Sequence, residues 1–431
     1  MTEEERRQII RLIKREVVPA IGCTEPMCVA LCVARATELL GCVPQHIDVL
    51  LSPNILKNAM GVGIPGTGMI GLPIAVALGA LIGRSEYQLE VLKDCTPEAV
   101  ERGKNYIAEK RIDISLKEGI TEKLYAEVHC SADGHEAVAI IAGGHTDFVY
   151  LSLDGAVSLD KRKPAGEAGT DDADDVPLTF RRVYDFATTA PLEEIEFIME
   201  AARLNCKAAE YSLKGDYGHG LGRMLQGPTE ERLMGCSIFS RILASTSGAC
   251  DARMSGAMIP VMSNSGSGNQ GISCTNPVVV YAEETHKSHE ELVRALTLSH
   301  LTVIHIKQSL GRLSALCGCV VASTGSSCGI TYLMGGTYQQ ITYAVKNMIA
   351  NIAGMLCDGA KPSCSLKVTT GVSTAMLSAV MAMENRHVTS MEGIIDDDVD
   401  VSIHNLTDIG CRGMNETDRV VLDIMTHKGC H

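Results

Sequence analysis

The chain has 431 residues, enough for two or three domains, and its composition is 45% hydrophobic without tryptophan. Its formal net charge of -14 argues against nucleic acid or an anionic membrane as the main partner. The first residues, MTEEERRQII, lack the apolar segment of a signal peptide, so we expect a cytoplasmic protein. Its 17 cysteines should then be reduced and available as ligands.

Three long stretches carry no Asp, Glu, Lys or Arg: 58–83, 254–282 and 313–345. Glycine, proline or small polar residues interrupt each of them, which disfavours membrane-spanning helices. We therefore expect all three stretches to be buried around one site.

Residues 1–45 are expected to form two helices. The first covers 3–18 with one apolar side, and the second runs from Pro26 to about Leu40 and stops at Gly41. Cys23 lies just before the second helix, where the helix dipole would stabilise a thiolate and lower the thiol pKa. Cys23 is therefore a candidate nucleophile or base, although a packed loop cysteine is equally compatible with the sequence.

Residues 46–179 show strand alternation and predict a smaller α/β domain. Strands are indicated by HIDVLL, RIDISL, KLYAEVHCSA, EAVAIIAGG and TDFVYLSL, with a helix beginning at Thr96-Pro97. His145, between two of these strands, is more typical of a turn residue than of a catalyst. The polar, acidic stretch 161–177 is expected to be a loop or linker.

A glycine-rich segment, NILKNAMGVGIPGTG, follows the first of these strands. It has neither the Walker nor the dinucleotide-binding spacing, so no nucleotide is inferred. Its backbone N–H groups could bind an anion, and a carboxylate is our interpretation. The candidate binding side chains here are Asn54, Lys57 and Asn58.

Residues 180–431 are expected to be helical, with a polar loop inside the uncharged stretch 254–282. Because buried polar groups need partners, this loop is predicted to bind a polar ligand or the sulfurs of a metal cluster. An ordinary loop is the alternative. The candidate side chains are Asn264, Ser265, Asn269 and Gln270.

Three cysteines stand out in the last third of the chain: Cys317, Cys357 and Cys364. A turn containing Asp358-Gly359 separates two helical patterns, so Cys357 should close one helix and Cys364 should open the next. Cys317 must come from a third segment. Three thiolates suit an iron–sulfur cluster or a soft metal, whereas buried structural cysteines are the plainer alternative.

The predicted fold class is α+β. A mainly α-helical cluster-binding domain is made of residues 1–45 and 180–431, and the α/β domain of residues 46–179 is inserted into it. Nothing in the sequence decides the oligomeric state, and a homo-oligomer is compatible with it.

The segments PAIGCTEP, SPNILKNAMGVGIPGTG, DARMSGAMIPVMSNSGSGNQG, RLSALC and MLCDGAKPSCSLKV resemble the L-cysteine desulfidase family, which is related to the iron–sulfur L-serine dehydratase alpha chain. The resemblance covers nearly the whole chain but not the acidic stretch 161–177. It implies a [4Fe-4S] cluster held by Cys317, Cys357 and Cys364, with Cys23 as the catalytic thiol or base.

The resemblance also implies a carbon–sulfur lyase that converts L-cysteine to hydrogen sulfide, ammonia and pyruvate. An iron with an open coordination position would act as the Lewis acid on the leaving sulfur, while Cys23 takes the proton of C2. An iron–sulfur L-serine or L-threonine dehydratase is the first alternative. A non-catalytic metal- or thiol-binding protein is the second.

Overall fold

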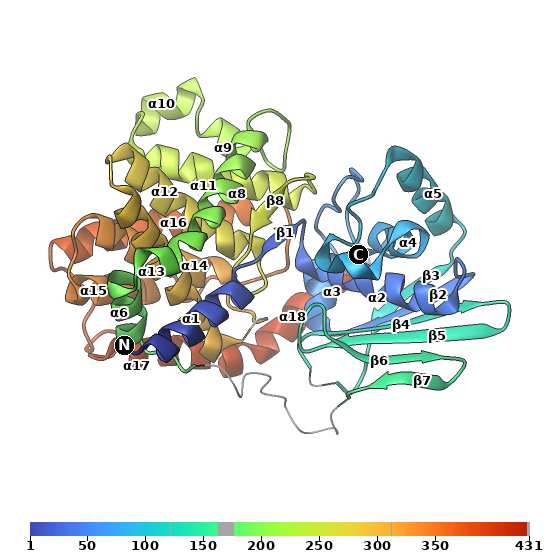
Figure 1. The fold of residues 1–431 in the computed structure, drawn as a ribbon. Helices are drawn as coiled ribbons and strands as arrows, with labels where there is room; N and C mark the ends of the chain where they lie inside the picture. The colour runs from blue at the N-terminus through green and yellow to red at the C-terminus, as the bar shows by residue number, and fades with distance from the viewer. Residues whose placement is uncertain (121, 163–175, 312, 429–431) are drawn as a thin grey trace.

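The computed structural model describes residues 1–120, 122–162, 176–311 and 313–428, without the side chains of 230, 231 and 233. It consists of a helical unit and an α/β unit that lie side by side (Figure 1). The α+β fold class is confirmed. Most of the predicted linker 161–177 lies outside the described residues.

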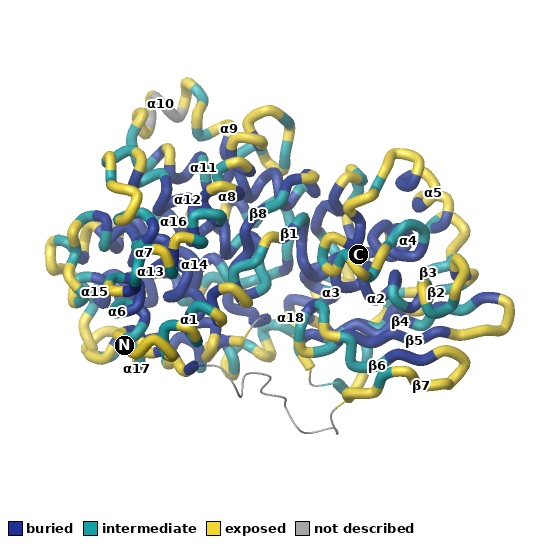
Figure 2. The backbone as a smooth tube through the Cα atoms, viewed as in Figure 1, coloured by how far each residue is buried: buried dark blue, intermediate teal, exposed yellow. Residues whose placement is uncertain are grey.

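The helical unit has one large apolar core, to which α1 and most helices after residue 176 contribute. Buried backbone is concentrated along its central helices, whereas the outer helices and loops are exposed (Figure 2). Its helices are α1 (Glu3–Glu16), α6 (Phe180–Thr189), α7 (Leu192–Ile195), η2 (Glu196–Ile198), α8 (Met199–Ser212), α9 (Leu221–Met224), α10 (Pro228–Met234), α11 (Ile238–Met254), α12 (Gly268–Glu284), α13 (His289–Leu310), α14 (Gly318–Leu333), α15 (Tyr338–Ile352), α16 (Cys364–Met383), α17 (Val399–Asp408), η3 (Ile409–Gly413) and α18 (Asn415–Thr426).

The α/β unit is a six-stranded sheet in the order β3-β2-β4-β5-β6-β7, parallel only between β2 and β3. Its helices α2 and α4 pack against strands of this sheet, and α5 packs on α4. The strands are β2 (His46–Leu51), β3 (Ile112–Leu116), β4 (Tyr125–Ala132), β5 (His135–Ala142), β6 (Phe148–Leu153) and β7 (Ala156–Asp160), and the helices are α2 (Thr24–Leu40), α3 (Pro53–Ala59), α4 (Leu72–Ile82), η1 (Ser85–Glu90) and α5 (Pro97–Ala108).

Helix α2 lies with the α/β unit, which differs from the expected division at residue 45. Its side chains from Met27 to Ala36 are nearly all buried, and they share the core of strands β2, β4 and β5. A helix that is apolar all round must be covered on every side, and α4, β4, β5 and η1 provide that cover. Cys23, immediately before α2, still belongs to the core of the helical unit. The chain therefore passes from one unit to the other at Cys23.

Two contacts join distant parts of the chain near this crossing. Strand β1 (Pro19–Ile21) pairs antiparallel with β8 (Pro260–Met262), which places the segment before Cys23 beside the predicted polar loop. Helix α18 packs on α3 of the α/β unit (Figure 1). The second contact joins the two units, and the first holds the segment that leads into the crossing at Cys23.

Helix α16 is the one described helix that is long and apolar enough to cross a membrane. Half of its apolar window is buried inside the protein, and it packs against α11, α14 and α15. These contacts are those of a core helix.

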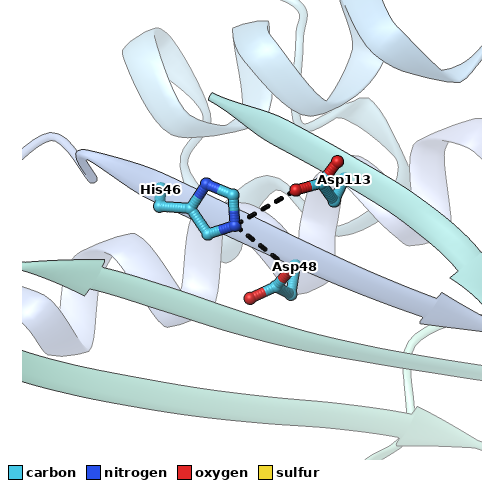
Figure 3. Close-up of side chains that lie close together, drawn as sticks. All are labelled: His46, Asp48 and Asp113. Atoms are coloured by element: carbon cyan, nitrogen blue, oxygen red, sulfur yellow. Dashed lines mark hydrogen bonds and ion pairs between the residues drawn. The ribbon is translucent and has the colours of Figure 1, made fainter. Parts of the chain in front are cut away.

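The outward face of the sheet is polar. His46 lies between Asp48 and Asp113, with its Nε2 at 3.2 and 3.4 Å from their carboxylate oxygens (Figure 3). Asp48 and Asp113 are directly paired on the parallel strands β2 and β3, where like charges repel, and the imidazole lies between their two carboxylates. Asp48 and Asp113 are exposed and His46 is half-buried, and the contacts among the three side chains account for their arrangement.

Candidate active site

A cavity of about 110 Å³ is lined by residues of both units. All four cysteines that the sequence singles out contribute to it: Cys23, Cys317, Cys357 and Cys364. These residues come from three separate segments, so only the fold brings them together. The rest of the lining is mostly polar or charged, and includes Glu25, Asn58, His145, Arg253, Ser265, Ser267, Asn269, Gln270, Lys307, Cys319 and Lys367.

Backbone pairing places Cys317 beside Cys357. The N–H of Cys317 donates to the carbonyl of Met355 at 3.0 Å, and the N–H of Cys357 donates to the carbonyl of Ala315 at 2.7 Å. These two bonds form an isolated antiparallel bridge at Leu316 and Leu356. Rigid backbone therefore fixes two of the three predicted ligands.

Cys364 is the first residue of α16, as predicted, but Cys357 does not close a helix. Helix α15 ends at Ile352, and Cys357 lies in the loop that follows, where it forms the bridge to Ala315. Lys367 reaches back from α16, donates to the carbonyl of Leu356 at 2.7 Å and pairs with the Asp358 carboxylate. The loop between the two cysteines is thereby anchored.

The three sulfur atoms are spread too widely for one metal ion. Among the described residues, no group with all ligand atoms within 4.8 Å of one another includes these cysteines. A single zinc-like ion would bring its sulfurs closer than that, because each metal–sulfur bond is about 2.3 Å long. Three thiols around one cavity at wider spacing fit a polynuclear cluster.

Cys319 is a fourth thiol in this part of the cavity. Its sulfur lies 3.3 Å from that of Cys317, and this contact lowers the pKa of Cys317 to about 7. Burial raises the pKa of Cys357 to about 11 and also raises that of Cys364. Cys317 is thus the thiol of the three that ionises most easily, and thiolates are the form that binds metal.

Cys23 is the N-cap residue of α2, but its pKa is shifted opposite to expectation. Its side chain is only 2% exposed, and its thiol donates to the Glu25 carboxylate at 2.9 Å. Burial and the negative charge of Glu25 raise the Cys23 pKa well above its usual value. The helix dipole is outweighed, so Cys23 is a neutral thiol at rest.

Glu25 is held as a carboxylate. Burial favours its neutral form, but His145, the Cys23 thiol and Arg253 together lower its pKa. Its oxygens also accept hydrogen bonds from Thr24 at 3.0 Å and from Asn58 at 3.2 Å. Cys23 and Glu25 therefore form a proton donor–acceptor pair inside the cavity.

The backbone before Cys23 can be formed only around a glycine. Gly22 has φ of +73°, and a Cβ atom on it would lie 2.4 Å from Cγ of Pro65. Together with the β1–β8 pairing, this tight approach fixes where the Cys23 thiol lies.

The predicted substrate-binding residues divide into two groups. Asn58, Ser265, Asn269 and Gln270 line the cavity. The other three, Asn54, Lys57 and Asn264, are buried but are absent from the described lining.

Lys57 and Asn264 have structural partners in place of a ligand. Lys57 is 2% exposed and forms an ion pair with Asp418 of α18. The amide nitrogen of Asn264 lies 3.0 Å from Nδ1 of the buried His300. The interpretation of Lys57 as an anion-binding side chain is therefore not supported, because Asp418 already matches its charge.

Four long helices begin at the cavity wall. Cys23 and Cys317 are the N-cap residues of α2 and α14, Cys364 begins α16, and Ser267 is the N-cap of α12. The N-terminal end of a helix carries partial positive charge. Four such ends around one cavity favour anionic occupants, such as thiolates and carboxylates.

The sequence pattern did not single out several charged residues of the cavity. Glu25 is the one charged residue of the motif PAIGCTEP, and Arg253 lies in the motif DARMSGAMIP directly before the uncharged stretch 254–282. His145 was judged a turn residue, yet it is buried at the cavity wall. Lys307 and Lys367 are spaced like ordinary helix-surface charges and gave no signal.

Comparison with known proteins gives one family and close relatives. Residues 86–423 match the family model described as serine dehydratase alpha chain. A UPF0597 protein of Bacteroides fragilis is 74% identical over 430 residues and covers the full length of both chains. UPF0597 proteins of Bacteroides thetaiotaomicron and Aeromonas hydrophila are 72% and 44% identical over 429 and 420 residues, covering 100% and 97% of this chain and 100% and 96% of their own. Cys23 and Glu25 precede the part that the family model matches.

Proposed function

Since the chain belongs to the serine dehydratase alpha chain family and is a UPF0597 protein, we propose that it is a lyase that eliminates the β-substituent of a small amino acid, and that L-cysteine is its substrate. The products would be hydrogen sulfide, ammonia and pyruvate. One observation carries the proposal: three candidate ligand thiols and a Cys23–Glu25 pair line the same buried cavity.

Cys317, Cys357 and Cys364 would hold a [4Fe-4S] cluster. Their number and spacing fit such a group, and the four helix ends at the cavity favour its thiolate ligands. When bound, the cluster supplies a Lewis acid for the group that leaves C3, and a soft one that favours sulfur over oxygen.

Cys23 and Glu25 would remove the proton of C2. The Glu25 carboxylate accepts the hydrogen bond of the Cys23 thiol, so it is placed to take that proton as substrate binds. The resulting thiolate then takes the proton from C2, the C3–sulfur bond breaks, and sulfide departs. The aminoacrylate that remains takes up water and yields ammonia and pyruvate.

The side chains proposed to move the proton are also shielded from bulk water. Cys23, Arg253 and Gln270 are each at most 3% exposed, and Glu25 is 7% exposed. In such surroundings a carboxylate and a thiol interact more strongly than they would in water.

A dehydratase acting on L-serine or L-threonine is the second candidate, because the family model that matches is named for serine dehydratase. The cavity fits a hydroxyl substituent as well as a thiol in size. The leaving group, sulfide or water, distinguishes the two reactions.

The test uses protein purified without oxygen and assayed first for iron and acid-labile sulfide. L-Cysteine, L-serine and L-threonine are then offered separately, and pyruvate or 2-oxobutyrate and free sulfide are measured. We expect equal amounts of sulfide and pyruvate from L-cysteine. Pyruvate from L-serine alone would establish the dehydratase, and no turnover of any of the three by iron-loaded protein would contradict both reactions.

A further inference from the structure

The cavity contains a buried arginine that forms no ion pair with an acid in the part of the chain that the structure describes. Arg253, at the end of α11, is 2% exposed and lines the cavity. Its described polar contact is a hydrogen bond from Nε to the carbonyl of Gly22, at 3.2 Å. Among the described residues no carboxylate forms an ion pair with its guanidinium, although Arg253 is near enough to Glu25 to help lower the pKa of that carboxyl. Burying a cation in this way is costly unless an anion joins it.

The surrounding backbone makes room for this side chain. A Cβ atom on Gly268 would lie 2.3 Å from Nε of Arg253 and 2.8 Å from Cζ. Only glycine at 268 allows the first turn of α12 to pass so close to the guanidinium. The arginine is therefore part of the design of the cavity wall, and its remaining N–H groups can form a bidentate pair with a carboxylate.

The two residues that follow Gly268 each have a side-chain oxygen that accepts no hydrogen bond from the described residues. Oδ1 of Asn269 and Oε1 of Gln270 are buried and have no hydrogen-bond partner among the described residues. The orientation of the Gln270 amide is fixed, because Nε2 donates to the carbonyl of Asn264 at 3.2 Å. Buried side-chain oxygens of this kind need a donor, and an ammonium group supplies three.

The two features lie in a consistent order along the cavity. Gln270 contacts Gly318, since a Cβ atom there would be 3.1 Å from Cδ of Gln270, and Gly318 directly follows Cys317. Gly268, which touches Arg253, is two residues before Gln270. The wall thus runs from a cation, past two acceptors, to the thiols.

We infer that this wall recognises the zwitterionic part of an α-amino acid, with Arg253 binding the carboxylate and Asn269 and Gln270 accepting from the ammonium. This inference rests on the proposed function and identifies the residues that would select its substrate class. The substituent on C3 is then directed toward Cys317 and its neighbours.

Two thiol compounds separate the two halves of the zwitterion. The first, 3-mercaptopropionate, has a carboxylate and no amine, and the second, cysteamine, has an amine and no carboxylate. Their dissociation constants are measured by calorimetry on iron-loaded protein without oxygen, so no turnover is required. Arg253→Gln removes the positive charge, whereas Arg253→Lys keeps the charge but cannot form a bidentate pair with a carboxylate. Arg241→Gln, on the exposed side of the same helix, is the control.

We expect Arg253→Gln to raise the dissociation constant of 3-mercaptopropionate about 10- to 100-fold, which is the usual effect of losing a charge-assisted hydrogen bond. The dissociation constant of cysteamine should not change. Arg253→Lys should lose less affinity for 3-mercaptopropionate than Arg253→Gln does, and Arg241→Gln should lose none. For L-cysteine, KM should rise more than kcat falls. A Gln270→Leu variant should show the opposite result: it should bind cysteamine more weakly and bind 3-mercaptopropionate as the unmodified protein does.

Equal weakening of both compounds by Arg253→Gln would overturn the inference, because the arginine would then only support the fold around Gly22. Unchanged binding of 3-mercaptopropionate, or its failure to bind the unmodified protein, would also overturn it. If the binding pattern is as expected but L-cysteine, L-serine and L-threonine are not turned over, the carboxylate assignment stands and the proposed function fails.

Discussion

The α/β unit and the helical unit bury uncharged helices in two different ways. Helix α4 of the α/β unit, LPIAVALGALI, is apolar throughout and simply fills a core. Helix α14 of the helical unit buries a series of hydroxyl side chains, and these bond to carbonyls: Thr324 donates to Val320 at 2.9 Å and Thr331 to Ser327 at 2.7 Å. Missing charge alone therefore does not mark a site.

Small residues on α14 and on the neighbouring helix α16 explain why α14 contributes to a site whereas α4 only fills a core. A Cβ atom on Gly325 would lie 2.4 Å from the carbonyl oxygen of Ser299, and one on Gly371 of α16 would lie 2.4 Å from Oγ of Ser323. Close approach of α13, α14 and α16 brings the helix starts at Cys317 and Cys364 to one cavity. The helical unit thus supplies the thiols, whereas Glu25, Asn58 and His145 come from the α/β side.

The largest effect should come from the thiols of the helical unit. Cys317→Ala, Cys357→Ala or Cys364→Ala should each lose most of the cluster absorbance, the iron and the activity, because one of three ligands is gone. Iron analysis and visible absorption after anaerobic reconstitution measure this. Cys328→Ala, a buried thiol on α14 away from the cavity lining, is the matched control and should keep its iron.

The variant Cys319→Ala tests whether Cys317 or the nearby Cys319 is the cluster ligand. Cys319 lines the cavity beside Cys317 but bonds to Met355 and to the carbonyl of Lys367. We expect this variant to keep its iron. Loss of iron from Cys319→Ala together with retention in Cys317→Ala would shift the ligand assignment by two residues.

The link between the units should show the next largest effect. Asp418→Asn leaves Lys57 charged and buried without its partner, which typically costs about 3–5 kcal/mol of unfolding free energy. Urea unfolding measures the loss. The double variant Lys57→Met, Asp418→Leu should recover much of it, since no buried charge is left. If the single and double variants are equally destabilised, the ion pair is not what joins α18 to α3.

A smaller effect is expected on the pH dependence of the free energy of unfolding, to which the two units should contribute differently. Burial lowers the pKa of His300, in the helical core, from 6.5 to about 3. The unfolded chain therefore takes up a proton near pH 6.5 that the folded protein refuses. This contribution to stability is complete above pH 6.5 and falls by about 1.4 kcal/mol per pH unit on acidification toward 3.

The sheet should not lose stability over this range, because the hydrogen bond to Glu127 raises the pKa of His129 and protonation of His129 therefore favours the folded state. Burial opposes ionisation of Glu127, but hydrogen bonds from His129, Lys117 and Tyr125 lower its pKa to about 2, so its contribution is lost only as pH falls below about 4.5. Unfolding free energies at pH 6.5 and 5 should differ by about 2 kcal/mol, and His300→Gln should remove the difference. His129→Gln, which removes a histidine whose pKa is shifted in the opposite direction, should not remove this fall in stability on acidification. A pH dependence that survives His300→Gln would exclude His300 as its source.

Local patterns predicted the elements better than their partners. The end of α2 at Gly41, the start of α16 at Cys364 and the α+β class follow from periodicity and from capping residues. The side on which α2 packs does not, because a helix that is apolar all round gives no direction. The ion pair of Lys57 cannot be anticipated from a local pattern, because its partner, Asp418, is 361 positions away in the chain.

The site was partly visible for the same reason. Cys317 and Gln270 are conspicuous in uncharged stretches, and Cys357 and Cys364 flank a turn between two helical patterns, so all four can be named from the sequence. Glu25 has no such local signal. The pKa of Cys23 could not be anticipated, because its direction depends on burial and on the Glu25 carboxylate.

The most direct test of this account compares iron content with turnover in Cys23→Ala. The account predicts a normal cluster, binding of L-cysteine as in the unmodified protein, and a rate about 10²–10⁴ lower, which is the usual loss when a proton-transfer group is removed. Cys28→Ala, a buried thiol one turn further along α2 and not in the cavity lining, should retain its activity. Loss of iron from Cys23→Ala, or full activity in it, would contradict the division between the thiols that hold the cluster and the thiol that moves the proton.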